Sequence, residues 1–283
     1  MIKNDRSQYV NNPIVVTPIN KLELPNLREV WNYKDLLFFL VRRDLLVRFQ
    51  QTVIGVLWIV LQPLIQLLIF YVIFGLLVKV PTGDVPYPVF FMSGFVFWQL
   101  FTQIVNSCSI SLLGNIGVIT KTYFPRLTLP FSTTIGAFID FVISFFMLLI
   151  FLLVNHYAIT FRFLFLPVLV LLTMTFALGV GLLFGALMVV FRDTKNLIGF
   201  ILQVWMYASP IIYPLTIAPE QFRRLAYINP MTGFIEAGRW IFLGSSSFPP
   251  LSNLAISAVV AVILLILGMY AFRSMENRIA DVM

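Results

Sequence analysis

The stretch FLFLPVLVLLTMTFALGVGLLFGALMVVF, from Phe163 to Phe191, contains no charged residue over 29 positions. The hydrocarbon core of a bilayer is about 30 Å thick, and about 20 apolar residues cross it as a helix. This stretch is therefore long enough to span a membrane. Similar apolar runs recur along the chain, and the six predicted crossings cover residues 53–78, 89–113, 127–154, 163–191, 197–214 and 251–272.

The composition of the chain indicates an all-α integral membrane protein. Hydrophobic residues make up 60% of the 283 positions and charged residues only 11%. An average soluble domain is about half apolar and a quarter charged, so a water-soluble fold is excluded. No run shows the alternating pattern of a membrane β-barrel strand. Six crossings also leave no room for a separate catalytic domain.

The positive charge of the chain indicates its orientation in the membrane rather than a nucleic-acid partner. The net charge is +7, and the chain has 19 Lys and Arg residues. Fourteen of them fall in the N-terminal segment, the second and fourth connections and the C-terminal segment, and five fall in the opposite loops. Cytoplasmic loops of membrane proteins carry the excess of Lys and Arg. We therefore expect a multi-pass protein with both termini in the cytoplasm.

The N-terminal segment is too polar to cross the membrane. Residues 1–30 carry three prolines and many polar side chains, which predicts an extended cytoplasmic tail. In residues 31–52, six charged residues interrupt an apolar stretch without gathering on one helical face. We expect a helix that lies at the cytoplasmic interface, with its Arg and Lys side chains extended toward water. The alternative is a helix packed against the first crossing.

Two connections are longer than turns between helices require. The cytoplasmic connection, residues 114–130, contains a short apolar piece that could form a helix, and its length predicts a docking element for another subunit. On the outer side, residues 218–228 and 231–243 are each too short to cross, and Asn229 and Pro230 separate them. This pattern predicts a re-entrant or interfacial helical hairpin.

The chain carries no sequence pattern of an enzyme or of an ATPase. It has no phosphate-binding loop, no G-x-S-x-G and no H-E-x-x-H motif. Cys108 has no second cysteine to pair with, and His156 lies in a short outer turn without a nearby acidic residue, so both are interpreted as structural. We expect no metal ion, no bound cofactor and no catalytic residue in this chain.

Some side chains within the crossings are candidates for a transport path. Asp140 is the one acidic residue near the middle of a crossing, and it either stabilises helix packing or lies beside the path. Aromatic faces can bind the apolar faces of sugar rings. The aromatic candidates for a channel lining are Trp58, Tyr71, Phe74, Phe91, Trp98 and Phe101. Gly181 and Gly185 form a G-x-x-x-G pattern, which predicts a close helix contact.

Six motifs, taken in order, resemble the ABC-2 type permeases, and in particular the subfamily that exports O-antigen, capsule or teichoic-acid polymers. The resemblance runs from about Trp31 to the C-terminus. The motifs are RFQQTVIGVLWIVLQP (Arg48 to Pro63), YPVFFMSGFVFWQLF (Tyr87 to Phe101), NIGVITKTYFPRLTLP (Asn115 to Pro130), FRD (Phe191 to Asp193), SPIIYP (Ser209 to Pro214) and NPMTGFIEAGRWIFLG (Asn229 to Gly244).

This resemblance implies a homodimer in the bacterial inner membrane, joined to two copies of a separate P-loop ATPase that binds ATP and Mg²⁺. It also implies export of a lipid-linked polysaccharide through a channel lined by aromatic side chains. A coupling helix on the ATPase would use Asn115, Lys121, Tyr123, Phe124, Pro125 and Arg126. An outer gate would use Phe222, Arg223, Tyr227, Phe234, Glu236 and Arg239.

Three other functions stay open at the level of sequence. The nearest is an ABC-2 permease for a small amphiphile such as a drug or a lipid. A membrane-embedded transferase would need acid or base groups at the membrane surface, and the chain offers only scattered ones: Asp84, His156 and Glu220. A proton-coupled carrier would depend on Asp140 alone.

Overall fold

The computed structural model describes residues 27–50, 57–191, 193–244 and 251–282, and these residues form helices without any strand. The predicted tail up to residue 26 and the first residues of the first crossing, 53–56, lie outside this described part. The longer helices are α2 (Lys34–Gln50), α3 (Leu57–Phe70), α4 (Tyr87–Gly114), α6 (Thr128–Val154), α7 (Leu166–Val190), α8 (Thr194–Ala208), α10 (Pro230–Leu243) and α11 (Leu251–Val282). The shorter elements are α1 (Leu27–Asn32), the π-helix η2 (Tyr71–Leu77), α5 (Ile116–Ile119), the 3₁₀ helices η3 (Phe161–Phe165) and η4 (Leu215–Ile217), and α9 (Glu220–Ala226).

Five of these helical segments are long and apolar enough to cross a membrane: Leu57–Leu77, Tyr87–Gly114, Thr128–Val154, Phe161–Val190 and Ser252–Met275. They correspond to five of the six predicted crossings. The remaining one, residues 197–214, corresponds to α8, which has 15 residues and ends at Ala208. Ser209 has extended backbone angles because it precedes Pro210, and a residue before proline is disfavoured in a helix.

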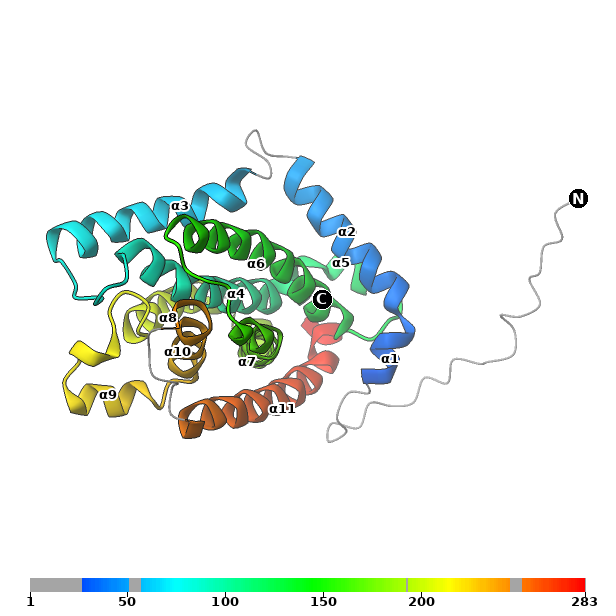
Figure 1. Ribbon diagram of the computed structural model, residues 1–283. Helices are drawn as coiled ribbons and strands as arrows, with labels where there is room; N and C mark the ends of the chain where they lie inside the picture. The colour runs from blue at the N-terminus through cyan, green and yellow to red at the C-terminus, as the bar shows by residue number, and fades with distance from the viewer. Residues whose placement is uncertain (1–26, 51–56, 192, 245–250, 283) are drawn as a thin grey trace, which may run out of the picture.

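Helix α4 forms the centre of the bundle. Twenty of its 28 residues are buried, and it packs against α6 on one side and against α7 and α10 on the other (Figure 1). From Val89 to Phe101 its sequence is apolar apart from Ser93 and Gln99, which is typical of a helix segment enclosed by other helices. Helix α4 is therefore a rigid element on which the other helices are placed.

Helix α7 makes close helix contacts through its glycines. A Cβ atom on Gly179 would lie 2.5 Å from the backbone nitrogen of Leu265 in α11, and one on Gly181 would lie 2.8 Å from the Cβ atom of Cys108 in α4. Such distances are shorter than van der Waals contact, so only glycine fits. The predicted close contact of Gly181 is confirmed, and Gly185 faces Ser109 on the same side of α4.

Helix α2 packs on α6 rather than on the first crossing. Leu40 and Val41 are buried in that contact, whereas Phe38 and Phe39 are exposed beside charged residues. Both apolar and charged side chains therefore face outward, as expected of a helix at a membrane interface. Figure 1 shows α2 along the edge of the bundle, close to α5.

Candidate functional site

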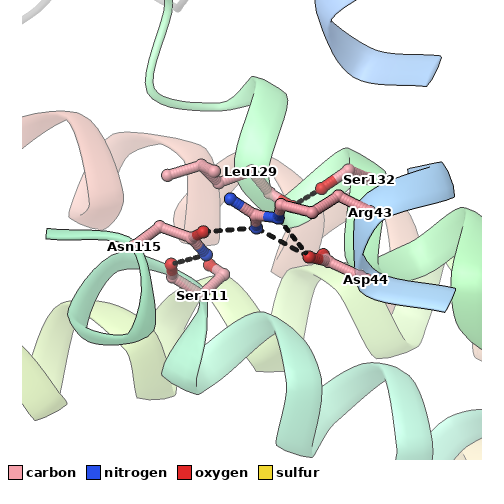
Figure 2. Close-up of polar contacts among 6 residues, drawn as sticks. All are labelled: Arg43, Asp44, Ser111, Asn115, Leu129 and Ser132. Atoms are coloured by element: carbon pink, nitrogen blue, oxygen red, sulfur yellow. Dashed lines mark hydrogen bonds and ion pairs between the residues drawn. The ribbon is translucent and has the colours of Figure 1, made fainter. Parts of the chain in front are cut away.

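A cluster of polar side chains joins α2 to the end of α4, and we call it the α2–α4 cluster (Figure 2). The guanidinium of Arg43 donates hydrogen bonds to Asp44 Oδ1 at 2.9 and 2.6 Å and to Asn115 Oδ1 at 2.6 Å. Asn115 Nδ2 donates to the carbonyl oxygen of Ser111 at 2.9 Å. Through these bonds, a residue of α2 is tied to the last turn of α4.

The position of Arg43 follows from the way α4 ends. The last carbonyl groups of a helix have no partner within it, and the helix dipole places partial negative charge there. Asn115 follows Gly114 and separates α4 from the single turn of α5. Its amide group satisfies the carbonyl of Ser111, and its oxygen accepts from Arg43. The cation of Arg43 therefore lies where the helix end favours positive charge.

A cavity of about 580 Å³ lies beside the cluster, between α2, α4, α5 and α6. Its lining includes Arg43, Gln103, Asn115, Ser132 and Asp140. Asp140, in the middle of α6, is only 1% exposed and is reached from this cavity rather than from the outer surface of the bundle. The predicted intramembrane carboxylate and the predicted coupling residue Asn115 thus border one polar space.

The structure separates the predicted docking residues into two kinds. Lys121 and Tyr123 are exposed, and Tyr123 has 68% of its surface accessible. Phe124 is 5% exposed and belongs to the hydrophobic core, while Pro125 and Arg126 are half-buried. Lys121 and Tyr123 can therefore contact another subunit, whereas Phe124 holds the connection against the bundle.

Three of the predicted channel aromatics lie inside the subunit. Phe91 stacks between Phe70 and Phe95 with ring centroids 5.0 Å apart on each side. Phe101 stacks on Phe176 at 5.2 Å, and Trp98 is 5.3 Å from Phe101. In this structure these rings face other helices of the same chain, because every residue of α4 from Val89 to Phe101 is buried. Their part in a channel stays a prediction.

The other three channel candidates lie on the first crossing and are accessible to different degrees. Trp58 of α3 has 50% of its surface exposed, and Tyr71 and Phe74 of η2 are half-buried. Phe74 stacks on Phe70 at 5.8 Å. These side chains are the aromatic candidates that a polymer passing outside the subunit core could contact.

The predicted gate residues divide between two short helices of the α9–α10 hairpin. In α9, Phe222 is exposed and Arg223 is half-buried, and Tyr227 follows the helix, also half-buried. In α10, Phe234 is fully buried, and Arg239 forms an ion pair with Glu236 at 3.0 Å. Most of α10 packs into the bundle against α4, α7 and α11, so it is not a helix lying on the surface.

No group of three or more His, Cys, Asp or Glu side chains that could hold a metal ion occurs among the described residues. Arg43 is a residue of the cluster that the sequence does not predict, because in the sequence it is one of six charges of the interfacial helix. The one clue in the sequence is Asn115, which follows the end of a predicted helix and whose side-chain amide oxygen needs a hydrogen-bond donor. No local pattern predicts that a residue 72 positions away supplies this donor.

The chain is similar to known transport proteins over most of its length. A family model described as ABC-2 type transporter matches residues 35–243. The O-antigen export system permease protein RfbA of Myxococcus xanthus is 29% identical over 258 residues, which cover 90% of this chain and 98% of that protein. RfbA of Klebsiella pneumoniae is 28% identical over 251 residues, covering 88% and 95%. The polysialic acid transport protein KpsM of Escherichia coli is 24% identical over 236 residues, covering 83% and 91%.

Proposed function

Because the chain belongs to the ABC-2 type transporter family, we propose that it is the permease subunit of an ATP-driven exporter that moves a lipid-linked polysaccharide across the bacterial inner membrane. The observation that carries this proposal is the similarity over nearly the whole length of O-antigen permeases and of a polysialic acid transport protein. A shared short motif would not support a substrate class. The match to RfbA of Myxococcus xanthus covers 90% of this chain and 98% of that protein, and a match of this length supports a substrate class.

The proposed partner is a separate P-loop ATPase, which would hold ATP and Mg²⁺, while this chain binds neither. The exposed Lys121 and Tyr123 offer a docking point close to the end of α4. The α2–α4 cluster joins that point to the interfacial helix through Arg43 and Asn115. A displacement of the connection by the ATPase would therefore act on α2 and α4 together.

We propose six crossings with both termini in the cytoplasm, so that α8 is the fifth crossing. At about 1.5 Å per residue, its 15 residues rise roughly 22 Å. Residues 209–213, which follow Ala208 as turns and bends, would complete the passage and bring the α9–α10 hairpin to the outer side. Cysteines at Lys195 and Thr216, which are both exposed, test this placement. Impermeant thiol reagents should label Lys195→Cys only from inside and Thr216→Cys only from outside. Labelling of both cysteines from the same side would show that α8 does not cross the membrane, and the chain would then have five crossings.

The mechanism requires two copies of this chain, because the buried half of α4, from Val89 to Phe101, is packed on by side chains of its own subunit and leaves the polymer no path there. ATP binding would draw the two ATPase subunits together, move the two connections and tilt the helices, and the polymer would pass outward between the copies. Aromatic rings such as Trp58, Tyr71 and Phe74 would let sugars of varied structure slide, since ring stacking tolerates different sugars.

The function is tested in the cell that carries this chain. Deletion should leave lipid-linked polysaccharide inside the cytoplasmic membrane and remove it from the surface, and the complemented strain should recover it. Purified with its ATPase, the permease should increase ATP hydrolysis when the lipid-linked polymer is added. Normal surface polysaccharide in the deletion strain, together with ATPase stimulation by a small amphiphile, would assign the permease to the other substrate class.

A further inference from the structure

Helix α10 is fixed at its beginning by Asn229. The Oδ1 atom of Asn229 accepts from the backbone nitrogen of Met231 at 3.1 Å and from Nε1 of Trp205 at 2.9 Å. Its Nδ2 atom donates to the hydroxyl of Ser209 at 2.9 Å. One amide group thus caps α10 and ties it to the end of α8.

The middle of α10 is fixed by Arg239, which is 3% exposed. Its guanidinium donates to Glu236 at 3.0 Å and to the carbonyl oxygen of Ile211 at 3.0 Å, and it lies 3.7 Å from the ring centroid of Phe90 in α4. Gly94 makes this contact possible, because a Cβ atom there would lie 3.2 Å from Nη2 of Arg239. A buried cation with these partners is costly to displace, since a new position would leave charge unpaired.

The end of α10 is fixed by Arg162 of η3. Its Nη1 atom donates to the carbonyl oxygens of Gly244 at 2.9 Å and Trp240 at 3.3 Å. The guanidinium also lies 4.8 Å from the ring centroid of Trp240. A cation at the C-terminal end of a helix is favoured by the helix dipole. Three separate polar contacts therefore hold α10 along its whole length.

Helix α9 is held differently, although it belongs to the same hairpin. Arg223 donates to the carbonyl oxygens of Thr216 and Ala218, which precede the helix, and Arg224 pairs with Glu220 of α9 itself. Phe222, Leu225 and Ile228 are 66%, 62% and 71% exposed. Figure 1 shows α9 at the periphery of the molecule, while α10 packs into the bundle against α4, α7 and α11. These arginine contacts of α9 are local and would move with it.

We infer that Asn229, Arg239 and Arg162 are positioning residues that hold α10 as the fixed part of the outer gate, and that α9 is the part that moves. This inference rests on the proposed function, because it concerns which half of the hairpin opens for the polymer. Asn229 marks the boundary between the two halves. The exposed apolar side chains of α9, Phe222 and Leu225, and of Ile228 just after it then close the exit when no polymer is present.

A disulfide between α10 and α11 tests whether α10 moves. A Cβ atom on Gly233 would lie 3.2 Å from the Cβ atom of Ser257, near the separation of about 3.5–4.5 Å found in disulfides. The double variant Gly233→Cys, Ser257→Cys is made in a Cys108→Ser background and assembled with the ATPase. Oxidation should leave polysaccharide export unchanged. A block of export that a reducing agent reverses would overturn the inference.

The same disulfide separates a positioning role from a general role in folding. Arg162→Ala should lower export several-fold, and oxidation of Arg162→Ala combined with the cysteine pair should restore it, reversibly with reducing agent. The matched control is Arg224→Ala, which removes an exposed arginine of α9 and should export like the parent. If export by the oxidised Arg162→Ala variant stays low, Arg162 does not act by fixing α10.

A distance measurement tests whether α9 moves and does not depend on the disulfide. Spin labels at Gln221 of α9 and at Ile159, both exposed, should change their separation between the nucleotide-free and ATP-trapped transporter. An unchanged distance in a transporter that exports would overturn the inference. A different result would count against the proposed function itself: neither the unmodified chain nor the Cys108→Ser parent exports polysaccharide.

Discussion

Replacement of Arg43 by alanine should uncouple export from ATP hydrolysis. The change removes the hydrogen bonds to Asp44 and Asn115 and separates α2 from the end of α4. The matched control is Arg42→Ala, because Arg42 is the neighbouring arginine of α2 and is exposed. Both variants lose one positive charge from the same helix, so any difference between them reports the contact of Arg43.

The size of the effect follows from the hydrogen bond to Asn115. Hydrogen bonds to charged groups contribute about 1.5–3 kcal/mol. The side chain of Arg43 is 30% exposed, so water can replace part of the interaction and the lower end of this range applies. About 1.5 kcal/mol corresponds to roughly a tenfold change in the ratio of coupled to uncoupled transporter. We expect Arg43→Ala to lower export per ATP hydrolysed by roughly tenfold, and Arg42→Ala by less than twofold.

The assay is surface polysaccharide and ATP hydrolysis measured on the same reconstituted or cellular transporter, with the amount of assembled complex as reference. A double-mutant cycle with Asn115→Ala shows whether the two side chains act together. If they do, the double variant should be no worse than either single one. Equal export by Arg43→Ala and Arg42→Ala, or simple additivity of Arg43→Ala and Asn115→Ala, would refute the coupling role of this bond.

Two further pairs of substitutions each compare a tightly packed position with an exposed or open one. Tyr123→Ala should weaken binding of the ATPase subunit in a pull-down without lowering thermal stability, whereas Phe124→Ala should destabilise the permease by about 3–5 kcal/mol, since Phe124 is buried. Equal thermal stability of these two variants would contradict the division between docking and packing. Gly238→Ala should cost about 1–3 kcal/mol, because its Cβ atom would lie 2.2 Å from the ring of Phe97. The control is Gly199→Ala, because a Cβ atom on Gly199 would have nothing within 4 Å. In the same heat-denaturation series it should be neutral or slightly stabilising. A loss of stability equal to that of Gly238→Ala would show that overpacking is not the cause.

The helical fold could be predicted from the sequence because long apolar runs have one solution in a bilayer. Hydrocarbon offers no partner for backbone groups, so a run of 20 or more apolar residues becomes a helix. The end of α8 could not be placed in this way. Residues 209–214 are as apolar as the helix before them, and hydropathy does not register that Pro210 and Pro214 interrupt it.

The candidate site was predicted only where its residues stand close together in sequence. Asn115, Lys121 and Tyr123 follow one another within a single connection, and their resemblance to a coupling element drew attention to them. The partner of Asn115 lies 72 positions away, and no local pattern identifies it. Phe91 and Phe101 show the opposite case, because an aromatic residue in an apolar helix has the same sequence signal whether it faces lipid, a channel or the core. What distinguishes them is that α4 is almost wholly apolar from Val89 to Phe101, on every face of the helix, which favours burial.

Both ends of the proposed mechanism are attached to α4. Its last turn is tied to α2 through Asn115 and Arg43, and its first turns hold α10 through Phe90, Gly94 and the guanidinium of Arg239. The helix is roughly 42 Å long at 1.5 Å per residue over its 28 residues, and 20 of those are buried. A largely buried helix of this kind bends little, so a displacement at the docking side also shifts the middle of α10, where Arg239 lies. The fixed half of the gate would therefore move with the core of the subunit. The opening has to come from α9, whose arginines bond to α9 itself and to the residues before it.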